Sequence, residues 1–172
     1  MALIIRPCGA AHASVLALVG QATFLDSYAG VIPGANILAH CEGEHSPARY
    51  AGWLDDPAYA FWIAETKEGA APVGYAMLSP PDLPVETRPG DLELKRIYLL
   101  GRFQGGGSGA ALLAAAIEEA TRRGAERLLL GVHGGNDAAI GFYRHQGFTQ
   151  IGVRKFRVGA SDYDDLVLTR GL

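Results

Sequence analysis

Cysteine is scarce in this sequence, and its apolar runs are short. The two cysteines, Cys8 and Cys41, form no spacing motif, so we expect no disulfide framework and a reducing, cytoplasmic location. The longest apolar run covers positions 110–117, far short of the roughly 18 residues that cross a bilayer. The N-terminus has no basic segment followed by an apolar stretch, so we expect no signal peptide and no membrane partner.

An excess of charge of either sign is also lacking. Fifteen Lys and Arg residues face 18 Asp and Glu residues, which gives a net charge of -3. Binding to a phosphate backbone requires a basic surface, so we expect no nucleic-acid partner. Hydrophobic residues make up 49% of the chain and charged residues 19%, which excludes disorder and predicts a packed core. The length of 172 residues fits a single domain over positions 1–172.

The apolar pattern, together with glycine and proline, predicts alternating strands and helices. Strands are predicted over 3–6, 58–65, 73–78, 91–100, 126–132, 148–158 and 163–169, and helices over 10–28, 35–53 (irregular), 107–123 and 136–146. The second and third strands read as a hairpin, and the four prolines of 79–90 indicate a loop. The apolar strand 126–132 is typical of a parallel, two-sided setting. This order predicts an α/β fold with a mixed sheet.

The strand over 91–100 changes its apolar parity along its length. Leu92 and Leu94 share one parity, whereas Ile97 and Leu99 share the other. Since a strand keeps one face with a period of two, the change predicts one inserted residue, a β-bulge near Lys95–Arg96. The alternative is that the other parity is buried as well, in which case no bulge is needed.

A glycine-rich turn joins this strand to the helix over 107–123. Glycines leave the backbone N–H groups at a helix N-terminus open to a phosphate, so Gln104–Gly109 is a candidate pyrophosphate cradle. The alternative is a flexible turn that binds nothing. A dinucleotide fingerprint requires an acidic residue at the end of the next strand, which instead ends in Gly131–Val132. The Walker A pattern fails because no Gly-Lys-Ser/Thr follows.

Two motifs in the second half of the chain point to a known family. Gln104-x-x-Gly107-x-Gly109 resembles motif A of the GCN5-related N-acetyltransferase (GNAT) superfamily. Asn136-x-x-Ala139-x-x-Phe142-Tyr143-x-x-x-Gly147-Phe148 resembles its motif B, and Val73–Ala76 looks like its third strand. Leu92–Tyr98 and Leu130–Val132 resemble most closely the bacterial PaiA-like branch, which acetylates spermidine and spermine.

The resemblance implies a fold and a cofactor site. The expected fold is a mixed, mostly antiparallel sheet of about seven strands, flanked by about four helices, whose central parallel pair splays apart to hold acetyl-CoA. It implies that the backbone of Ile97, Tyr98 and Leu99 pairs with the pantetheine amides. It also implies pyrophosphate binding by the cradle, with the residues Gln104, Gly105, Gly106, Gly107, Ser108 and Gly109. Relatives often carry a basic side chain where this chain has Gly106, so the backbone N–H groups must contribute more here.

The resemblance also assigns roles to side chains. Asn136 corresponds to a pantetheine-contacting asparagine, although it is equally suited to capping a helix. Tyr143 corresponds to the general acid that protonates the leaving thiolate, and the alternative is a buried tyrosine that anchors its helix. The acceptor amine must lose a proton before it attacks, and Glu93 is the candidate base. The alternative for Glu93 is an exposed carboxylate paired with Lys95 or Arg96.

Further residues are candidates for the acceptor side. Asp26 and Tyr28 end the first helix, where substrates of this family enter, and His133 ends the second cofactor strand. The cluster His40–His45 contains ligand-type residues, but they are too crowded for a zinc-finger spacing or a His pair at i, i+4, so we expect no metal.

The motifs predict an acetyl-CoA-dependent N-acetyltransferase acting by direct attack of a small-molecule primary amine, with a polyamine as one candidate. Two other classes stay open, a non-catalytic acetyl-CoA sensor and a nucleotide-binding oxidoreductase domain. Other acceptors, such as an antibiotic, an amino acid or a protein N-terminus, also stay open because this fold serves many. We expect a monomer or a homodimer.

Overall fold

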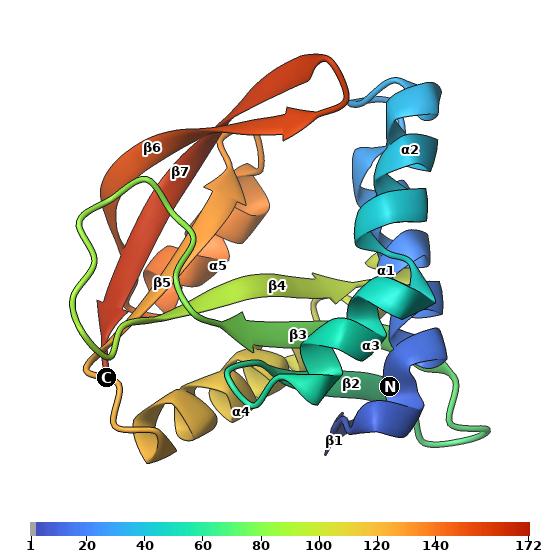
Figure 1. Cartoon of the computed structure of the whole chain (residues 1–172), viewed down its shortest axis with the longest axis horizontal. Coiled ribbons are helices and arrows are strands. Elements are labelled where there is room, and N and C mark those ends of the chain that lie inside the picture. Colours follow the sequence, from blue (N-terminus) through green and yellow to red (C-terminus); the bar gives the residue numbers. More distant parts are fainter. Residues whose placement is uncertain (1–2) are drawn as a thin grey trace.

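A single seven-stranded sheet forms the centre of the computed structural model, which describes residues 3–172 (Figure 1). The strand order is β1-β2-β3-β4-β5-β7-β6, and among the strands described within residues 3–172 only the β4–β5 pair is parallel. The strands are β1 (Leu3–Pro7), β2 (Ala60–Thr66), β3 (Pro72–Ser79), β4 (Leu92–Leu99), β5 (Arg127–His133), β6 (Thr149–Val158) and β7 (Ser161–Gly171). The mixed, mostly antiparallel sheet confirms the predicted fold.

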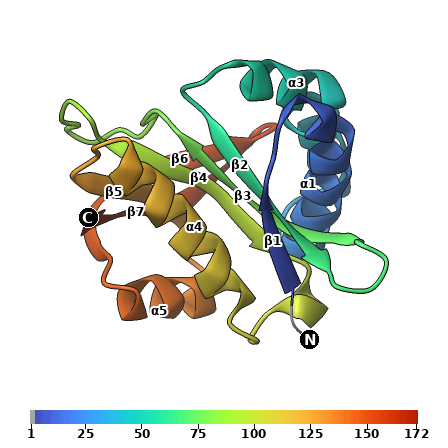
Figure 2. The same ribbon diagram turned by 90° about the horizontal axis from the view of Figure 1, so that it is seen from below.

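Helices cover both faces of the sheet (Figure 2). They are α1 (Ala13–Tyr28), α2 (Gly34–Glu44), α3 (Pro47–Asp55), α4 (Ser108–Arg122) and α5 (Asp137–His145), with short 3-10 turns at Ala10–His12 and Gly101–Phe103. The first face packs against α4, whose apolar stripe includes Leu112 and Ala116, and against α5. The second face packs against α1 and α3, through Leu16 and Trp53 among others. No helix within residues 3–172 is both long and apolar enough to cross a membrane.

The irregular helical stretch predicted over 35–53 is two helices rather than one. Ser46 caps α3 by accepting a hydrogen bond from the Arg49 N–H at 3.2 Å, and Pro47 occupies its first turn. Proline has no N–H to continue α2, and it restricts the residue before it to an extended conformation. The helical path therefore breaks at Ser46, and the stretch predicted as one helix forms α2 and α3.

The predicted β-bulge in β4 is present. Met77 of β3 pairs with Arg96, but the next residue, Leu78, pairs with Leu94, so Lys95 is the extra residue. Before the bulge, Leu94 points into the core beneath α4, and beyond it Leu99 does the same. The bulge therefore lets two apolar segments of opposite parity share one core, and it turns Glu93 and Tyr98 to the opposite face of the sheet.

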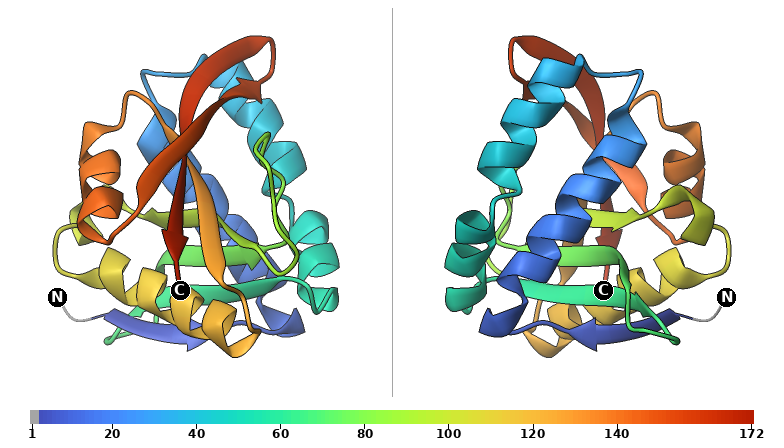
Figure 3. Two further views of the ribbon diagram at one scale, coloured as in Figure 1. Left: turned by 90° about the vertical axis from the view of Figure 1, so that its left-hand side faces the viewer. Right: turned by 90° about the vertical axis from the view of Figure 1, so that its right-hand side faces the viewer.

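The parallel strands β4 and β5 pair only at their beginnings. Leu92 and Glu93 pair with Leu128 and Leu129, and no pairing follows. Beyond this point, β5 continues to pair with β7 and β4 continues to pair with β3. The two strands diverge in Figure 1, and the β6–β7 hairpin rises beside α2 (Figure 3), where Val158 packs with Ile37. The sheet is thus split along its middle.

Candidate active site

The split exposes one backbone edge of β4. The Leu100 N–H donates to the Val73 carbonyl at 2.9 Å, so the neighbouring Leu99–Gly74 pair is of the non-hydrogen-bonded type. Because the two pair types alternate, the backbone groups of Leu99 and Ile97 face the split, while those of Tyr98 face β3. Two of the three predicted backbone partners for pantetheine therefore lie at the open edge, and the register turns the Tyr98 backbone away from it.

The glycine-rich turn opens the N-terminus of α4 to a ligand. Gly105 and Gly107 have φ angles of +81° and +83°, in the left-handed region that favours glycine, and Gly107 is the N-cap of α4. A Cβ at Gly105, Gly106 or Gly107 would meet no atom within 4 Å, so the backbone is uncovered. The first turn of this 15-residue helix contains no acidic residue. The N–H groups from Gly105 through Ser108 and Gly109 therefore fit a phosphate group.

Two side chains hold the cradle in place. Gln104 donates from Nε2 to the Leu99 carbonyl at 2.9 Å, which connects the turn to the open edge of β4. Asp26, at the end of α1, accepts the Gly101 N–H at Oδ2 over 2.8 Å. The predicted acceptor-side residue Asp26 is thus bound to the turn that precedes the cradle.

Helix α5 supplies the motif B residues. Asn136 caps this helix, since its Oδ1 accepts the Ala139 N–H at 3.0 Å, and no hydrogen bond occupies its amide group among the described residues. Tyr143 is 7% exposed and packs against the rings of Phe142 and Phe148. Burial, with a smaller contribution from Tyr98, raises the pKa of the Tyr143 hydroxyl, so this group keeps its proton at neutral pH.

Glu93 is buried, not exposed as the alternative interpretation supposed. It is 1% exposed, and its Oε2 accepts the Asp82 N–H of the proline-rich loop at 2.7 Å. Lys95 pairs with Asp82 instead, and Arg96 pairs with Glu44. Burial raises the pKa of the Glu93 carboxyl, although the Lys95 ammonium opposes the shift. This carboxylate therefore anchors the loop over the second face of the sheet.

Comparison with known proteins identifies the family. A model of the acetyltransferase (GNAT) family matches residues 33–148. The chain is 36% identical over 160 residues to an uncharacterized N-acetyltransferase of Mycobacterium tuberculosis, which covers 93% of this chain and 97% of the relative. The chain belongs to the GNAT acetyltransferase family.

Solved structures agree with the GNAT assignment. The PaiA N-acetyltransferase of Thermoplasma acidophilum, solved with coenzyme A, superposes over 100% of both chains with a TM-score of 0.76 at 19% identity. A ribosomal-protein-alanine N-acetyltransferase of Brucella melitensis superposes with a TM-score of 0.68 at 27% identity, over 99% of this chain and 100% of that one. The predicted family is confirmed, and the likeness to PaiA is one of fold.

Candidate acceptor residues gather on the second face of the sheet, opposite α4. The Tyr28 hydroxyl lies 3.4 Å from the Tyr98 hydroxyl, which connects the end of α1 with β4. The Tyr28 ring lies 6.5 Å from the His133 ring, centroid to centroid. The predicted residues Tyr28 and His133 therefore come together across the split, and Tyr98 contributes its side chain to the same place.

The sequence interpretation missed two charged residues beside this group. Asp165 of β7 pairs with His133 on one side and with Arg154 of β6 on the other, so the three form a row across the sheet. The Arg154 guanidinium lies against Gly131, where a Cβ would come within 2.7 Å of it. Only the cross-strand register reveals this row, because its residues come from three separate strands.

The His40–Glu44–His45 region is part of a buried polar network. His45 is 1% exposed, and its Nδ1 lies 2.9 Å from the Tyr50 hydroxyl, which also accepts from Arg96 at 3.2 Å. Burial, and then the Arg96 charge, lowers the pKa of His45 to about 2. His40 instead stacks on Phe24 at 4.3 Å. The rings therefore stabilise the packing of α1, α2 and α3 against one another.

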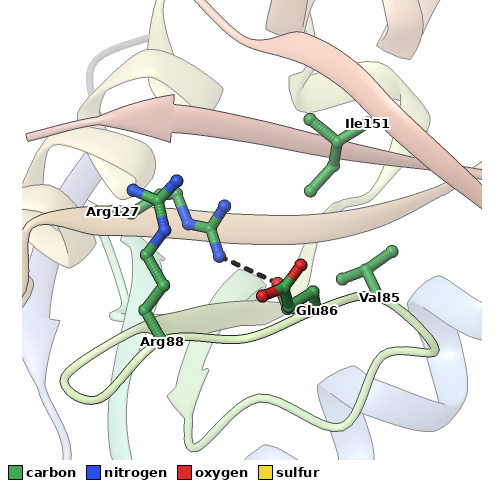
Figure 4. Close-up of a pocket in the computed structure, with 5 residues that line it drawn as sticks. All are labelled: Val85, Glu86, Arg88, Arg127 and Ile151. Carbon is green, nitrogen blue, oxygen red and sulfur yellow. Dashed lines mark hydrogen bonds between the residues drawn. The ribbon is translucent and has the colours of Figure 1, made fainter.

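A separate cavity of about 220 Å³ lies at the opposite end of the parallel strands (Figure 4). It is lined by Val85, Glu86, Arg88, Arg127 and Ile151. The Arg127 guanidinium donates to the buried Asp91 carboxylate at 3.1 Å and to the Glu86 carbonyl at 3.1 Å. The Asp91 carboxylate therefore neutralises the charge of Arg127. Because Arg127 is the first residue of β5, the cavity lies at the end of the strand away from the cradle.

Proposed function

We propose that the protein transfers the acetyl group of acetyl-CoA directly to a primary amine of a small molecule, with a polyamine as one candidate acceptor. The observation that carries this proposal is the split between β4 and β5, which leads from the open backbone of Ile97 and Leu99 to the glycine cradle at α4. An extended chain of amides can pair with such an edge as an added strand. The phosphate groups then meet the helix N-terminus.

Acetyl-CoA would supply the acetyl thioester, and the residues of the chain would orient it. The Ile97 and Leu99 backbone would bind the pantetheine amides, while the free amide group of Asn136 would donate from the β5 side of the split. Gln104 would hold the cradle against the end of β4, as its hydrogen bond to Leu99 does already. The N–H groups of the glycine turn would carry the anionic charge without a basic side chain.

Tyr143 would assist departure of the thiolate. Its raised pKa makes complete proton transfer to a less basic thiolate unfavourable in the ground state. A protonated hydroxyl still stabilises the charge that develops on sulfur by donating a hydrogen bond to it. Tyr143 therefore acts as a hydrogen-bond donor first and as an acid when the bond to sulfur breaks.

The cysteines favour direct transfer over a covalent acetyl-cysteine. Cys8 and Cys41 are both free, and burial raises the pKa of the Cys8 thiol to about 12. Burial also raises the pKa of Cys41. Protonated thiols are poor nucleophiles, so the amine itself attacks. We propose a monomer or a homodimer that works in the cytoplasm, with Glu93 and His133 as the two candidates for the proton acceptor.

The test is release of the CoA thiol from acetyl-CoA with spermidine, spermine, putrescine and a mixed panel of other amines. Release that depends on a polyamine supports the whole proposal. Release with another amine only, or with a peptide N-terminus, keeps the enzyme and rejects the polyamine. Binding of acetyl-CoA without release for any acceptor favours a sensor, and absence of binding would overturn the role of the cradle.

A further inference from the structure

His133, Asp165 and Arg154 form a cross-strand row beside the split. The three are direct neighbours in register on β5, β7 and β6, so their side chains project from the same face of the sheet. That face also carries Tyr98 and meets Tyr28, and it lies opposite the core beneath α4. The row therefore borders the acceptor side of the acetyl-transfer site.

The two carboxylate oxygens of Asp165 have different surroundings. Asp165 is 4% exposed, and Arg154 holds Oδ2 with two nitrogens, Nε at 3.1 Å and Nη2 at 3.0 Å. Oδ1 is buried and has no hydrogen-bond partner within residues 3–172, and His133 Nδ1 lies 3.8 Å from it. An unpaired buried oxygen is costly, and a small rotation of the imidazole brings Nδ1 into hydrogen-bond range. Asp165 therefore favours the tautomer with the proton on Nδ1.

The other ring nitrogen of His133 is left free to accept a proton. The ring is partly exposed, and no hydrogen bond engages Nε2 in the described part of the chain. Nε2 lies beneath Gly135, where a Cβ would come within 3.0 Å of it. The rings of Tyr28 and Tyr163 flank the imidazole at centroid distances of 6.5 Å and 6.1 Å. Gly135 has no side chain on one side of Nε2, and the two tyrosine rings border the other sides. An amine can therefore approach this nitrogen.

Glu93 is less suited to the same role. It is almost fully buried, and one carboxylate oxygen already accepts the Asp82 N–H. Its contact is with the proline-rich loop, whereas His133 contacts the tyrosines that bridge the split. The difference in exposure and in partners distinguishes the two candidates for the base.

We propose that His133, oriented by Asp165, is the group that takes the proton from the acceptor ammonium. The proposal rests on the proposed acetyl transfer. The ammonium nitrogen carries three protons and the product amide one. Of the two protons lost, one passes to His133 Nε2 and then to water, and the other replaces the proton that Tyr143 gives to sulfur. One C–N bond forms as one C–S bond breaks, and Asp165 is a positioning residue.

The first test replaces the base and then restores it. We expect His133→Ala to lower kcat by roughly 100-fold with the best amine of the panel while acetyl-CoA affinity stays unchanged. Added imidazole should recover a substantial part of the lost rate in His133→Ala but not in Glu93→Gln. The proposal would be overturned in favour of Glu93 if imidazole did not restore the rate of His133→Ala. It would also be overturned if Glu93→Gln abolished turnover and His133→Ala did not.

A second test does not depend on turnover. Long-range ¹H–¹⁵N NMR of the wild-type protein should show the His133 proton on Nδ1 and a bare Nε2, and Asp165→Asn should shift that balance. A wild-type ring protonated on Nε2 overturns the proposal even if the variants do not fold. Wild-type protein that binds acetyl-CoA but acetylates no amine rejects the proposed function instead, whatever the tautomer.

A third test uses the glycine above the ring. Gly135→Ala would place a methyl group 3.0 Å from Nε2, so we expect it to lower kcat by roughly tenfold or more, as loss of a positioned proton acceptor does. Gly141→Ala, at an exposed position of helix α5 with no atom within 4 Å of its Cβ, is the matched control and should keep wild-type turnover. Equal turnover of the two variants would contradict the assigned position of Nε2.

Discussion

Replacing Tyr143 by phenylalanine separates its catalytic role from its role in packing. The ring of Tyr143 is buried against Phe142 and Phe148, and both contacts survive the substitution. Its hydroxyl makes no hydrogen bond to any residue described by the structure, from Leu3 to Leu172. Removing an unpartnered hydroxyl leaves no other group unsatisfied, so we expect the free energy of unfolding to change by less than about 0.5 kcal/mol.

The rate should respond differently. If the hydroxyl stabilises the departing thiolate, its loss raises the barrier by about 1.4 kcal/mol or more, which is at least a tenfold fall in kcat. Affinity for acetyl-CoA should remain at the wild-type value because the cradle and the open edge of β4 are untouched. The assay is CoA-thiol release at saturating acetyl-CoA, alongside direct binding of acetyl-CoA and urea unfolding of both proteins.

The combination of results decides the role. Unchanged stability with a tenfold loss of kcat identifies a group that acts only in the reaction. Unchanged kcat removes Tyr143 from the leaving-group role, and the anchoring interpretation then stands alone. A large loss of stability would refute the claim that the hydroxyl has no structural partner.

Three further predictions follow from the geometry. Because burial holds the pKa of His45 at about 2 while an unfolded histidine titrates near 6.5, only the unfolded state takes up this proton as the pH falls. Stability is therefore full above pH 6.5 and decreases below it, by about 2 kcal/mol between pH 7 and pH 5, measured by urea unfolding. Gly107→Ala, at a φ of +83°, should lower the free energy of unfolding by about 1–2 kcal/mol and weaken acetyl-CoA binding several-fold, measured by calorimetry. Asp26→Ala, which removes the hydrogen bond to Gly101, should weaken acetyl-CoA binding and leave the acceptor KM unchanged in steady-state kinetics.

Each of these predictions has its own control. His45→Phe keeps an aromatic ring but cannot titrate, so its stability should vary less with pH, whereas the exposed His145→Gln should follow wild type. An identical slope in wild type and His45→Phe would show that His45 is not the source. Gly141→Ala should leave acetyl-CoA binding unaltered, and equal losses in both glycine variants would argue against the cradle. An acceptor KM that rises in Asp26→Ala would instead support the acceptor role predicted for Asp26 from the sequence.

Local sequence patterns are sufficient to predict the strands, most of the helices and the bulge in β4. The parity change between Leu94 and Ile97 predicts an inserted residue because a strand has a fixed period of two, and the structure places it at Lys95. The glycine turn and the motif spacing likewise predict the cradle, because they depend on residues close in the chain. The break at Ser46 was missed, although Pro47 signalled it, because the apolar pattern continues on both sides.

Partners from distant segments could not be inferred in this way. Asp26 ends a helix as an ordinary polar residue, and only the packing of α1 against the end of β4 brings it to the Gly101 N–H. Glu93 reads as an exposed charge on a strand until the proline-rich loop covers it and binds it through Asp82. Burial is a property of what packs above a residue, and no local pattern carries that information.

The sequence by itself therefore determined the order of the strands, the glycine-rich turn before α4 and the family, since periodicity, glycine and motif spacing act over short stretches of chain. The tertiary structure alone decided where β4 and β5 part, which backbone edge faces the split, and that His133, Asp165 and Arg154 form one row. The physical reason is register: hydrogen-bonded pairing between strands far apart in the chain sets which side chains meet, and that pairing depends on the whole sheet.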